Sequence, residues 1–238
     1  MIFRAVDFHS HILPGIDDGS VSVEESIAML HKEAEQGITK VIAPPHFYAY
    51  KDNLDRFLER RSYAEQLLSK ELQKHSGLPK VAVGAEVHYY SGFSHSRAIS
   101  NLVIEDTKYI LIEMPSAPWT EEMYHELDRI YSKQGLVPII AHIDRYISRF
   151  RTYGIPKRLA ELPVLIQANA EFFVNKGTAA MAVKMLRDDG IHLLGSDCHN
   201  LTTRMPNLGD ALSIIERRLG SEAIERINQY EQRVLVDG

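Results

Sequence analysis

The sequence predicts an α/β protein: a closed or nearly closed TIM-like barrel of seven parallel strands, formed by a single domain over residues 1–238. Three observations lead to this fold class. Apolar, strand-like segments alternate with amphipathic, helix-like segments, which is the pattern of parallel βαβ units. Histidines and carboxylates recur at the ends of the strand-like segments, where barrel enzymes carry their active sites. The length of the chain suits one α/β barrel.

The first third of the chain alternates strand, helix, strand and helix. Residues 3–8 are apolar and run into a loop that contains proline and glycine. Ser22 and Glu25 have the spacing of a capping box, which predicts that a helix begins there. Residues 38–43 are rich in β-branched side chains, as expected of a buried strand, and residues 53–75 have the pattern of a long amphipathic helix.

The middle third continues the alternation after one irregular stretch. Residues 80–84 and 109–112 read as strands, and residues 88–101 between them have no clear period. A helix is predicted over residues 120–135, followed by a strand over residues 137–141.

The last third repeats the pattern and ends in two helices. Its predicted strands are residues 164–168 and 191–194. Its predicted helices are residues 156–161, 176–189, 208–219 and 221–229. The chain has no linker, low-complexity tract or short internal repeat, which again predicts one domain.

Composition excludes several classes of protein. The net charge of −5 and the pI of about 6.1 argue against binding to nucleic acid or to an anionic membrane. The single cysteine excludes an internal disulfide framework. No signal-peptide pattern opens the sequence, and no apolar run approaches membrane-spanning length. We therefore expect a cytoplasmic protein with no membrane insertion.

Candidate metal ligands lie at or just beyond the carboxyl ends of most predicted strands. They are His9, His11, His46, Glu86, Glu113, His142, Asp197 and His199, with Asp17 and Asp18 in the first loop. In a strand, side chains two residues apart point the same way, so His9 and His11 can converge on one ion. A barrel would bring all of these strand ends to one mouth, whereas an open sheet would spread them along a line. Imidazole and carboxylate ligands favour manganese or iron, with zinc possible.

The chain resembles the polymerase and histidinol phosphatase (PHP) superfamily in the segments DFHSHI, DDG, PPH, GAE, LIEMP, AHIDR and GSDCHN. More narrowly, it is similar to the bacterial manganese-dependent tyrosine phosphatases of capsular and exopolysaccharide operons. The resemblance extends from about Asp7 to Arg204. It implies a distorted (β/α)7 barrel with up to three metal ions, most simply manganese. The implied partner is a phosphotyrosyl protein, the tail of a bacterial tyrosine kinase that controls polysaccharide export.

The same resemblance implies roles for individual residues. The implied ligands of the first ion are His9, His11, Glu86 and Asp197. Glu86 would bridge to a second ion, whose other implied ligands are Glu113 and His142. The implied ligands of the third ion are Asp18, His46 and His199. Arg145 and Arg204 would contact the phosphate of the substrate. Relatives often carry glutamate at the position of Asp144, which we expect to support Arg145 or its loop.

Other residues near the expected mouth belong to no motif. His88 and His95 could touch a substrate, but their loop position alone carries little weight. Four tyrosines could line a groove for an extended phosphopeptide, although packing is the commoner role. They are Tyr48, Tyr50, Tyr89 and Tyr90.

Phosphate monoesters hydrolyse extremely slowly without a catalyst, so a site must supply a nucleophile and neutralise negative charge. Metal ions can do both, and guanidinium groups can hold phosphate oxygens bidentately. A tyrosyl leaving group, with a phenol pKa of about 10, depends less on a general acid than an alkoxide does. We therefore predict a metal-dependent phosphomonoester hydrolase, specifically a protein-tyrosine phosphatase.

Four alternatives stay open. A histidinol phosphatase or another small-molecule phosphatase would use the same metals. An amidohydrolase would also begin with two histidines, but no lysine lies at a strand end to bridge its metals. A regulatory subunit could carry an inert metal site. Cys198 and Arg204 have the C-x5-R spacing of thiol-dependent phosphatases, although no glycine lies between them and Cys198 should point away from its neighbours' side chains.

Overall fold

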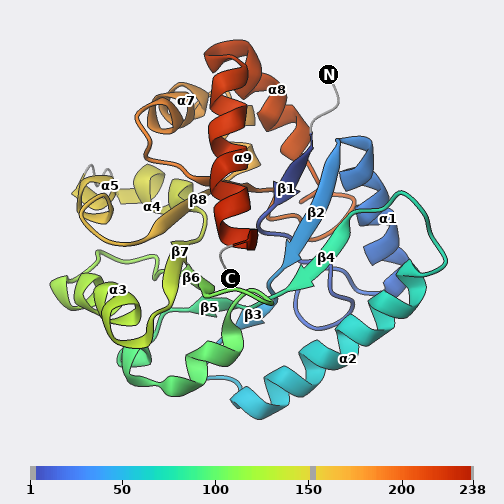
Figure 1. The fold of residues 1–238 in the computed structure, drawn as a ribbon, viewed down its shortest axis with the longest axis horizontal. Coiled ribbons are helices and arrows are strands. Elements are labelled where there is room, and N and C mark those ends of the chain that lie inside the picture. The colour runs from blue at the N-terminus through green and yellow to red at the C-terminus, as the bar shows by residue number, and fades with distance from the viewer. Residues whose placement is uncertain (1–3, 151–153, 237–238) are drawn as a thin grey trace.

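The computed structural model describes residues 4–150 and 154–236, with parallel strands at the centre and helices around them (Figure 1). The strands are β1 (Ala5–Asp7), β2 (Ile38–Ala43), β3 (His46–Phe47), β4 (Lys80–Val83), β5 (Glu86–His88), β6 (Tyr109–Glu113), β7 (Val137–Ile140), β8 (Leu165–Asn169) and β9 (Leu193–Gly195). All described strand pairs are parallel, as the βαβ pattern predicted.

The helices lie on the outside of the strands and across one end of them (Figure 1). They are α1 (Val23–Glu35), α2 (Leu54–Leu72), α3 (Glu121–Gln134), α4 (Ile143–Phe150), α5 (Gly154–Leu159), α6 (Ala170–Val174), α7 (Ala179–Arg187), α8 (Leu208–Leu219) and α9 (Ser221–Val236), with 3-10 helices η1 (Phe93–His95) and η2 (Arg97–Leu102). None of the helices in the described ranges is long and apolar enough to cross a membrane.

The strands form two sheets, in the orders β1-β2-β4 and β3-β5-β6-β7-β8-β9. Pro44 and Pro45 separate β2 from β3, because proline has no N–H group to continue a ladder. The neighbouring strand segment is interrupted in the same way at Gly84, between β4 and β5. A hydrogen bond from the Glu86 N to the Pro45 O (3.0 Å) keeps the two segments side by side across the break. The sequence predicted β2 and β4 but missed the short strands that carry His46 and Glu86.

The ends of the chain's first and last strands also meet. The backbone N of Phe8 donates to the O of Leu194 (3.0 Å), and the N of Asp197 donates to the O of His9 (2.7 Å). The parallel sheets are therefore curled, and strands far apart in the sequence border the same central space. This arrangement confirms the predicted α/β class and brings the loops after β1 and β9 together.

Apolar side chains pack on both faces of the curled sheets. One face packs against the helices, and the other forms an inner cluster that includes Val6, Phe8 and Leu111. Alternate residues of a strand point to opposite faces, which divides the strand residues between the two clusters. Val234 of α9 joins the inner cluster, and Glu231 of α9 accepts a hydrogen bond from the N of Val6 at the start of β1 (3.2 Å). Helix α9 thus covers the amino ends of the strands.

Local signals place several helix ends correctly. Ser22 Oγ accepts from the N of Glu25 (3.3 Å), which confirms Ser22 as the N-cap of α1, while Glu25 Oε2 accepts from the N of Val21 (2.9 Å), one residue before the position that a capping box uses. Asn53 caps the start of α2 with its side-chain oxygen. Helix α3 ends at Gly135, whose φ of 71° lies in the left-handed region that glycine adopts readily.

Short helices account for most of what the pattern missed. Helices α4 and α6 were not predicted, and the irregular stretch 88–101 contains η1 and most of η2. Elements of one or two turns contain too few residues to show a helical period, so their sequences carry little signal.

Candidate metal centre

His9 and His11 follow β1, and both are buried. They lie two residues apart on extended chain, so their side chains point the same way and their Nε2 atoms are 3.1 Å apart. Two glycines allow other segments to pack against this pair. A Cβ at Gly195 would lie 2.6 Å from the Cβ of His9, and a Cβ at Gly19 would lie 2.2 Å from the carbonyl oxygen of His11.

Glu86 on β5 lies at the centre of the cluster, and its side chain is only 1% exposed. Its Oε2 atom lies 3.2 Å from Nε2 of His9, 3.3 Å from Nε2 of His11 and 2.8 Å from Nδ1 of His46. Its Oε1 atom lies 2.8 Å from Nε2 of His142. One carboxylate therefore faces four imidazole rings that come from three different strand ends.

Glu113 and His142 extend the cluster along β6 and β7. Nε2 of His142 lies 3.7 Å from Oε1 of Glu113. The other Glu113 oxygen lies 3.0 Å from Nδ1 of His88, so His88 reaches the site as a neighbour of a candidate ligand. His142 has a φ of 35°, an unusual backbone conformation for a residue other than glycine. The hydroxyl of Tyr146 lies 3.3 Å from its other ring nitrogen.

Asp18, His46 and His199 meet on the opposite side of His11. Oδ1 of Asp18 lies 3.4 Å from Nε2 of His46 and 3.6 Å from Nε2 of His199. The rings of His11 and His199 are close, with centroids 3.9 Å apart. The side chain of Asp18 is 68% exposed, so this part of the cluster opens to solvent.

Asp197 joins the histidine pair to the two predicted arginines. Its Oδ1 atom lies 3.8 Å from Nε2 of His9 and 3.6 Å from Nε2 of His11. Arg204 donates from Nη2 to Oδ1 (2.8 Å), and Arg145 donates from Nη2 to Oδ2. All nine predicted ligands and both arginines therefore lie in one contiguous cluster at the carboxyl ends of the strands.

The two central carboxylates are held ionised. Burial by itself raises the pKa of Glu86, but the surrounding histidines, His9 foremost, hold that pKa well below its usual range. Burial also raises the pKa of Asp197, and the positive charges of His9 and Arg145 lower it below its ordinary value. The centre of the cluster therefore keeps negative charge that can attract cations.

The pKa values of two of the histidines are shifted in opposite directions. Burial lowers the pKa of His11, but the neighbouring carboxylates of Asp17 and Glu86 outweigh this and raise it to about 10. Burial and the charge of His11 lower the pKa of His199 to about 4. A metal ion that binds His11 must therefore displace a proton, whereas His199 is already neutral.

Cys198 does not take part in the cluster. Its side chain is fully buried and points to Ser10, whose Oγ lies 3.0 Å from the sulfur. Burial, together with the charges of Glu33 and Asp7, raises the pKa of the thiol well above its usual range. A reactive cysteine needs the opposite environment, so the C-x5-R interpretation fails here.

The donor atoms fit a divalent transition metal. Nδ1 of His46, Oε2 of Glu86 and Nε2 of His199 are buried and make no hydrogen bond in the described part of the chain, although the first two are only 2.8 Å apart. Three groups have ligand atoms within 4.8 Å of one another: His9–His11–Glu86, His46–Glu86–Glu113 and His11–His46–His199. Buried nitrogen and oxygen atoms that converge without partners suit a metal ion of the manganese, iron or zinc type.

The sequence matches the family described as "Capsular polysaccharide synthesis, CpsB/CapC" over residues 5–236. The chain belongs to the CpsB/CapC family. The tyrosine-protein phosphatase YwqE of Bacillus subtilis (strain 168) is 31% identical over 226 residues, which cover 91% of this chain and 86% of the relative. The tyrosine-protein phosphatase CpsB of Streptococcus pneumoniae is 27% identical over 248 residues, which cover 98% of each chain.

The fold of this CpsB/CapC protein also matches a solved relative. A chain from the crystal structures of YwqE from Bacillus subtilis and CpsB from Streptococcus pneumoniae, described as unique metal-dependent tyrosine phosphatases, aligns with a TM-score of 0.85. The sequence identity is 28%, and the alignment covers 97% of this chain and 94% of that one.

The CpsB/CapC chain supports its histidines with two further polar residues: Asp17, which the sequence offered as a candidate ligand, and Gln167, which it did not single out. Oδ2 of Asp17 lies 2.8 Å from Nδ1 of His11 and accepts a hydrogen bond from the N of His46 (3.1 Å). Oε1 of Gln167 accepts a hydrogen bond from the N of His142 (2.6 Å). Such partners fix the orientation of metal-binding imidazoles. The sequence feature that could have identified Gln167 is its polar side chain within an otherwise buried, apolar strand.

Two further residues support Asp197. Asn169 donates from Nδ2 to Oδ2 of Asp197 (2.9 Å). Oδ1 of Asp144 accepts a hydrogen bond from the N of Asn169 (3.0 Å). Asp144 thus holds the backbone at the end of β8, and its expected support of Arg145 or its loop stays a prediction. Asn169, like Gln167, is a polar residue in the otherwise apolar segment of β8.

Proposed function

We propose that this CpsB/CapC protein is a metal-dependent phosphomonoester hydrolase that acts as a tyrosine-protein phosphatase. One observation carries the proposal: the buried carboxylate of Glu86 faces four imidazole rings, and Arg145 and Arg204 lie beside it. The hydrolysis of a phosphate ester is assisted by bound metal ions next to guanidinium groups that can hold the phosphate oxygens. Membership of a family whose curated relatives are tyrosine-protein phosphatases supports the choice of substrate.

We further propose which residues hold the metal. The proposed ligands are His9, His11, Asp18, His46, Glu86, Glu113, His142, Asp197 and His199. Up to three ions would bind, with manganese favoured and iron or zinc as alternatives. Bound divalent cations supply charge neutralisation for the phosphate and make water a better nucleophile at neutral pH.

Arg145 and Arg204 are proposed to hold the phosphate. Each donates to a different oxygen of Asp197, so one carboxylate orients both guanidinium groups toward the site. Their side chains are 36% and 37% exposed, so a substrate can reach both guanidinium groups, although Nη1 of Arg145 also lies 3.5 Å from Oε1 of Glu113. A guanidinium group carries five N–H donors and stays charged, so it can bind the carboxylate and phosphate oxygens together.

The curled sheets are proposed to form a distorted (β/α)7 barrel in a single domain that covers residues 1–238. In this interpretation β2 with β3 and β4 with β5 are two bent strands rather than four. Support comes from the backbone hydrogen bonds that link the two proposed bent strands to each other across the break, and from those that link the segments after β1 and β9. The barrel mouth would then coincide with the candidate metal centre.

The proposed partner is a phosphotyrosyl protein, specifically the tail of a bacterial tyrosine kinase that regulates capsular or exopolysaccharide synthesis. The family description supports the link to polysaccharide synthesis. A cytoplasmic location stays a prediction, and it rests on the single, unpaired cysteine.

A substrate panel tests the proposed activity. The manganese-loaded protein should hydrolyse a phosphotyrosyl peptide with a higher kcat/KM than a phosphoseryl peptide of the same sequence or histidinol phosphate. Faster hydrolysis of histidinol phosphate would favour the small-molecule alternative. If the metal-loaded protein turns over none of the three, the regulatory-subunit alternative is the better one.

A further inference from the structure

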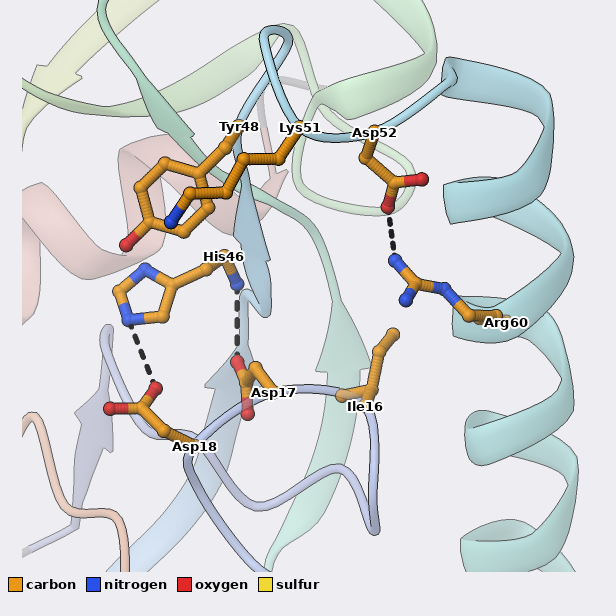
Figure 2. Close-up of a pocket in the computed structure, with 8 residues that line it drawn as sticks. All are labelled: Ile16, Asp17, Asp18, His46, Tyr48, Lys51, Asp52 and Arg60. Atoms are coloured by element: carbon orange, nitrogen blue, oxygen red, sulfur yellow. Dashed lines mark hydrogen bonds and ion pairs between the residues drawn. The ribbon is translucent and has the colours of Figure 1, made fainter.

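A cavity of about 500 Å³ opens directly beside the candidate metal centre (Figure 2). Asp18 and His46 belong to both the cavity wall and the centre, so the two spaces are continuous. The loop after β3 supplies Tyr48 and Lys51 to one wall, and the loop after β1 supplies Ile16 to another. The cavity therefore leads outward from the metal ligands between two loops.

Tyr48 is the main aromatic surface of this cavity. It lies two residues after His46, and the two ring centroids are 5.4 Å apart. The ammonium group of Lys51 lies 4.4 Å from the centroid of the Tyr48 ring, as Figure 2 shows, which holds the ring by a cation–π contact. Tyr50 and His88 pack near the ring, with centroids 5.8 Å and 5.3 Å from it. Tyr48 is thus held in place on several sides.

The far end of the cavity carries charges that already neutralise each other. Arg60 of α2 donates to Asp52, as the dashed line in Figure 2 marks. A phosphate is therefore better placed at the inner end, where Arg204 and the proposed ligands lie. The middle of the cavity, beside the Tyr48 ring, Ile16 and the methylene stem of Lys51, is left for the apolar part of a substrate.

We propose that Tyr48 determines specificity by packing against the phenyl ring of an aryl phosphate whose phosphate group lies at the metal centre. This inference rests on the proposed function and identifies the residue that selects its substrate. A phosphotyrosine side chain places a flat ring directly behind the phosphate, which is where the Tyr48 ring lies. Aromatic pairs prefer offset or edge-to-face contacts, and the open side of Tyr48 can offer either. Phosphoserine has no ring to make this contact.

Kinetics of three variants test the proposal. Tyr48→Ala should lower kcat/KM for a phosphotyrosyl peptide about tenfold, mainly through KM, since a packed aromatic pair has about that value. The same variant should leave kcat/KM for the matching phosphoseryl peptide within about twofold of wild type. Tyr48→Phe keeps the ring and should behave like wild type. Tyr131→Ala, at an exposed tyrosine of α3, is the matched control and should leave kcat/KM unchanged for both peptides.

Binding of phosphonates gives the same comparison without turnover. Calorimetry should show that wild-type, manganese-loaded protein binds phenylphosphonate more tightly than methylphosphonate, and that Tyr48→Ala loses this preference. Equal losses of kcat/KM for the phosphotyrosyl and phosphoseryl peptides in Tyr48→Ala would mean that Tyr48 acts through His46. No loss of kcat/KM for either peptide would mean that Tyr48 has no role in specificity. Either result overturns the proposal. A wild-type protein that prefers phenylphosphonate but hydrolyses no peptide would contradict the proposed function and leave the aryl site standing.

Discussion

Two groups of buried acids have pKa values that are shifted in opposite directions. Glu86 and Asp197 lie among histidines, which lower both pKa values, and Arg145 adds to the lowering at Asp197. Asp7 and Glu33 are equally buried, and burial raises both pKa values. The contrast teaches that burial alone does not determine the state of a carboxyl group, because nearby positive charge can reverse its effect.

Asp7 acts on the backbone. Oδ1 of Asp7 accepts hydrogen bonds from the N of His9 (2.9 Å) and the N of Ser196 (3.0 Å). Asp7 therefore fixes the chain immediately before two candidate ligands. Donor atoms of Asp7, Glu33 and Cys198 lie within 4.8 Å of one another, yet no ion pair with a cationic side chain occurs at either acid in the described ranges. The raised pKa values favour the protonated forms of these two acids over the ionised forms that a metal ion needs.

The largest expected effect is a difference in metal content and turnover between variants of the two groups of acids. Glu86→Gln removes the charge that faces four histidines, and it should lower both metal content and turnover more than about 100-fold. Glu33→Gln is the matched control: it imitates a protonated acid, so metal content and turnover should stay near wild type. Elemental analysis and phosphotyrosyl-peptide turnover of the two variants give the answer. Equal losses in both variants would mean that the two groups do not differ as described.

The next effect is expected at the arginines that donate hydrogen bonds to Asp197. Arg204→Ala should cost about 2–4 kcal/mol of transition-state stabilisation, because one charged, bidentate partner of the phosphate is lost. Turnover of a phosphotyrosyl peptide and of p-nitrophenyl phosphate should fall by similar factors. A large loss with the peptide and none with the small ester would place Arg204 in peptide recognition instead.

The smallest effect concerns a third buried acid without cationic neighbours. Burial raises the pKa of Glu231 from 4.5 to about 8. Between these two pH values the folded protein keeps a proton that the unfolded chain has lost, so stability falls as pH rises through this window. Glu231→Gln imitates the protonated form and keeps an acceptor for the N of Val6.

Urea unfolding at two pH values measures this effect. Near pH 5 wild type and Glu231→Gln should have similar free energies of unfolding, since wild type is largely protonated in the folded state. Near pH 9 the variant should be more stable, on the order of 2–4 kcal/mol. A wild type that gains stability relative to the variant as pH rises would show that Glu231 is ionised in the folded protein.

Much of the fold and the site could be predicted because the signals are local. A spacing of two residues on a strand determines that His9 and His11 point together, and capping residues mark helix ends such as that at Ser22. The series of strand ends then predicted which residues meet. All nine candidate ligands and both arginines do lie together, although their role as ligands stays a prediction.

The rest depends on contacts between distant segments. The predicted strand over residues 38–43 ends before Pro44 and Pro45, and only the fold reveals that His46 lies in a further short strand beside Glu86. Gln167 contacts His142 from another segment, so it has no recognisable spacing to that histidine. The opposite pKa shifts of Asp7 and Glu86 follow from surroundings that distant segments build.

The most direct test of the central claim, that the histidine and carboxylate cluster is a catalytic metal centre, is turnover of a phosphotyrosyl peptide before and after removal of metal. Treatment with EDTA and gel filtration should abolish turnover, and Mn²⁺ should restore it. Cys198→Ser should keep wild-type activity through the same cycle, because its buried thiol takes no part. Full turnover by the metal-free protein, or loss of turnover in metal-loaded Cys198→Ser, would contradict the claim.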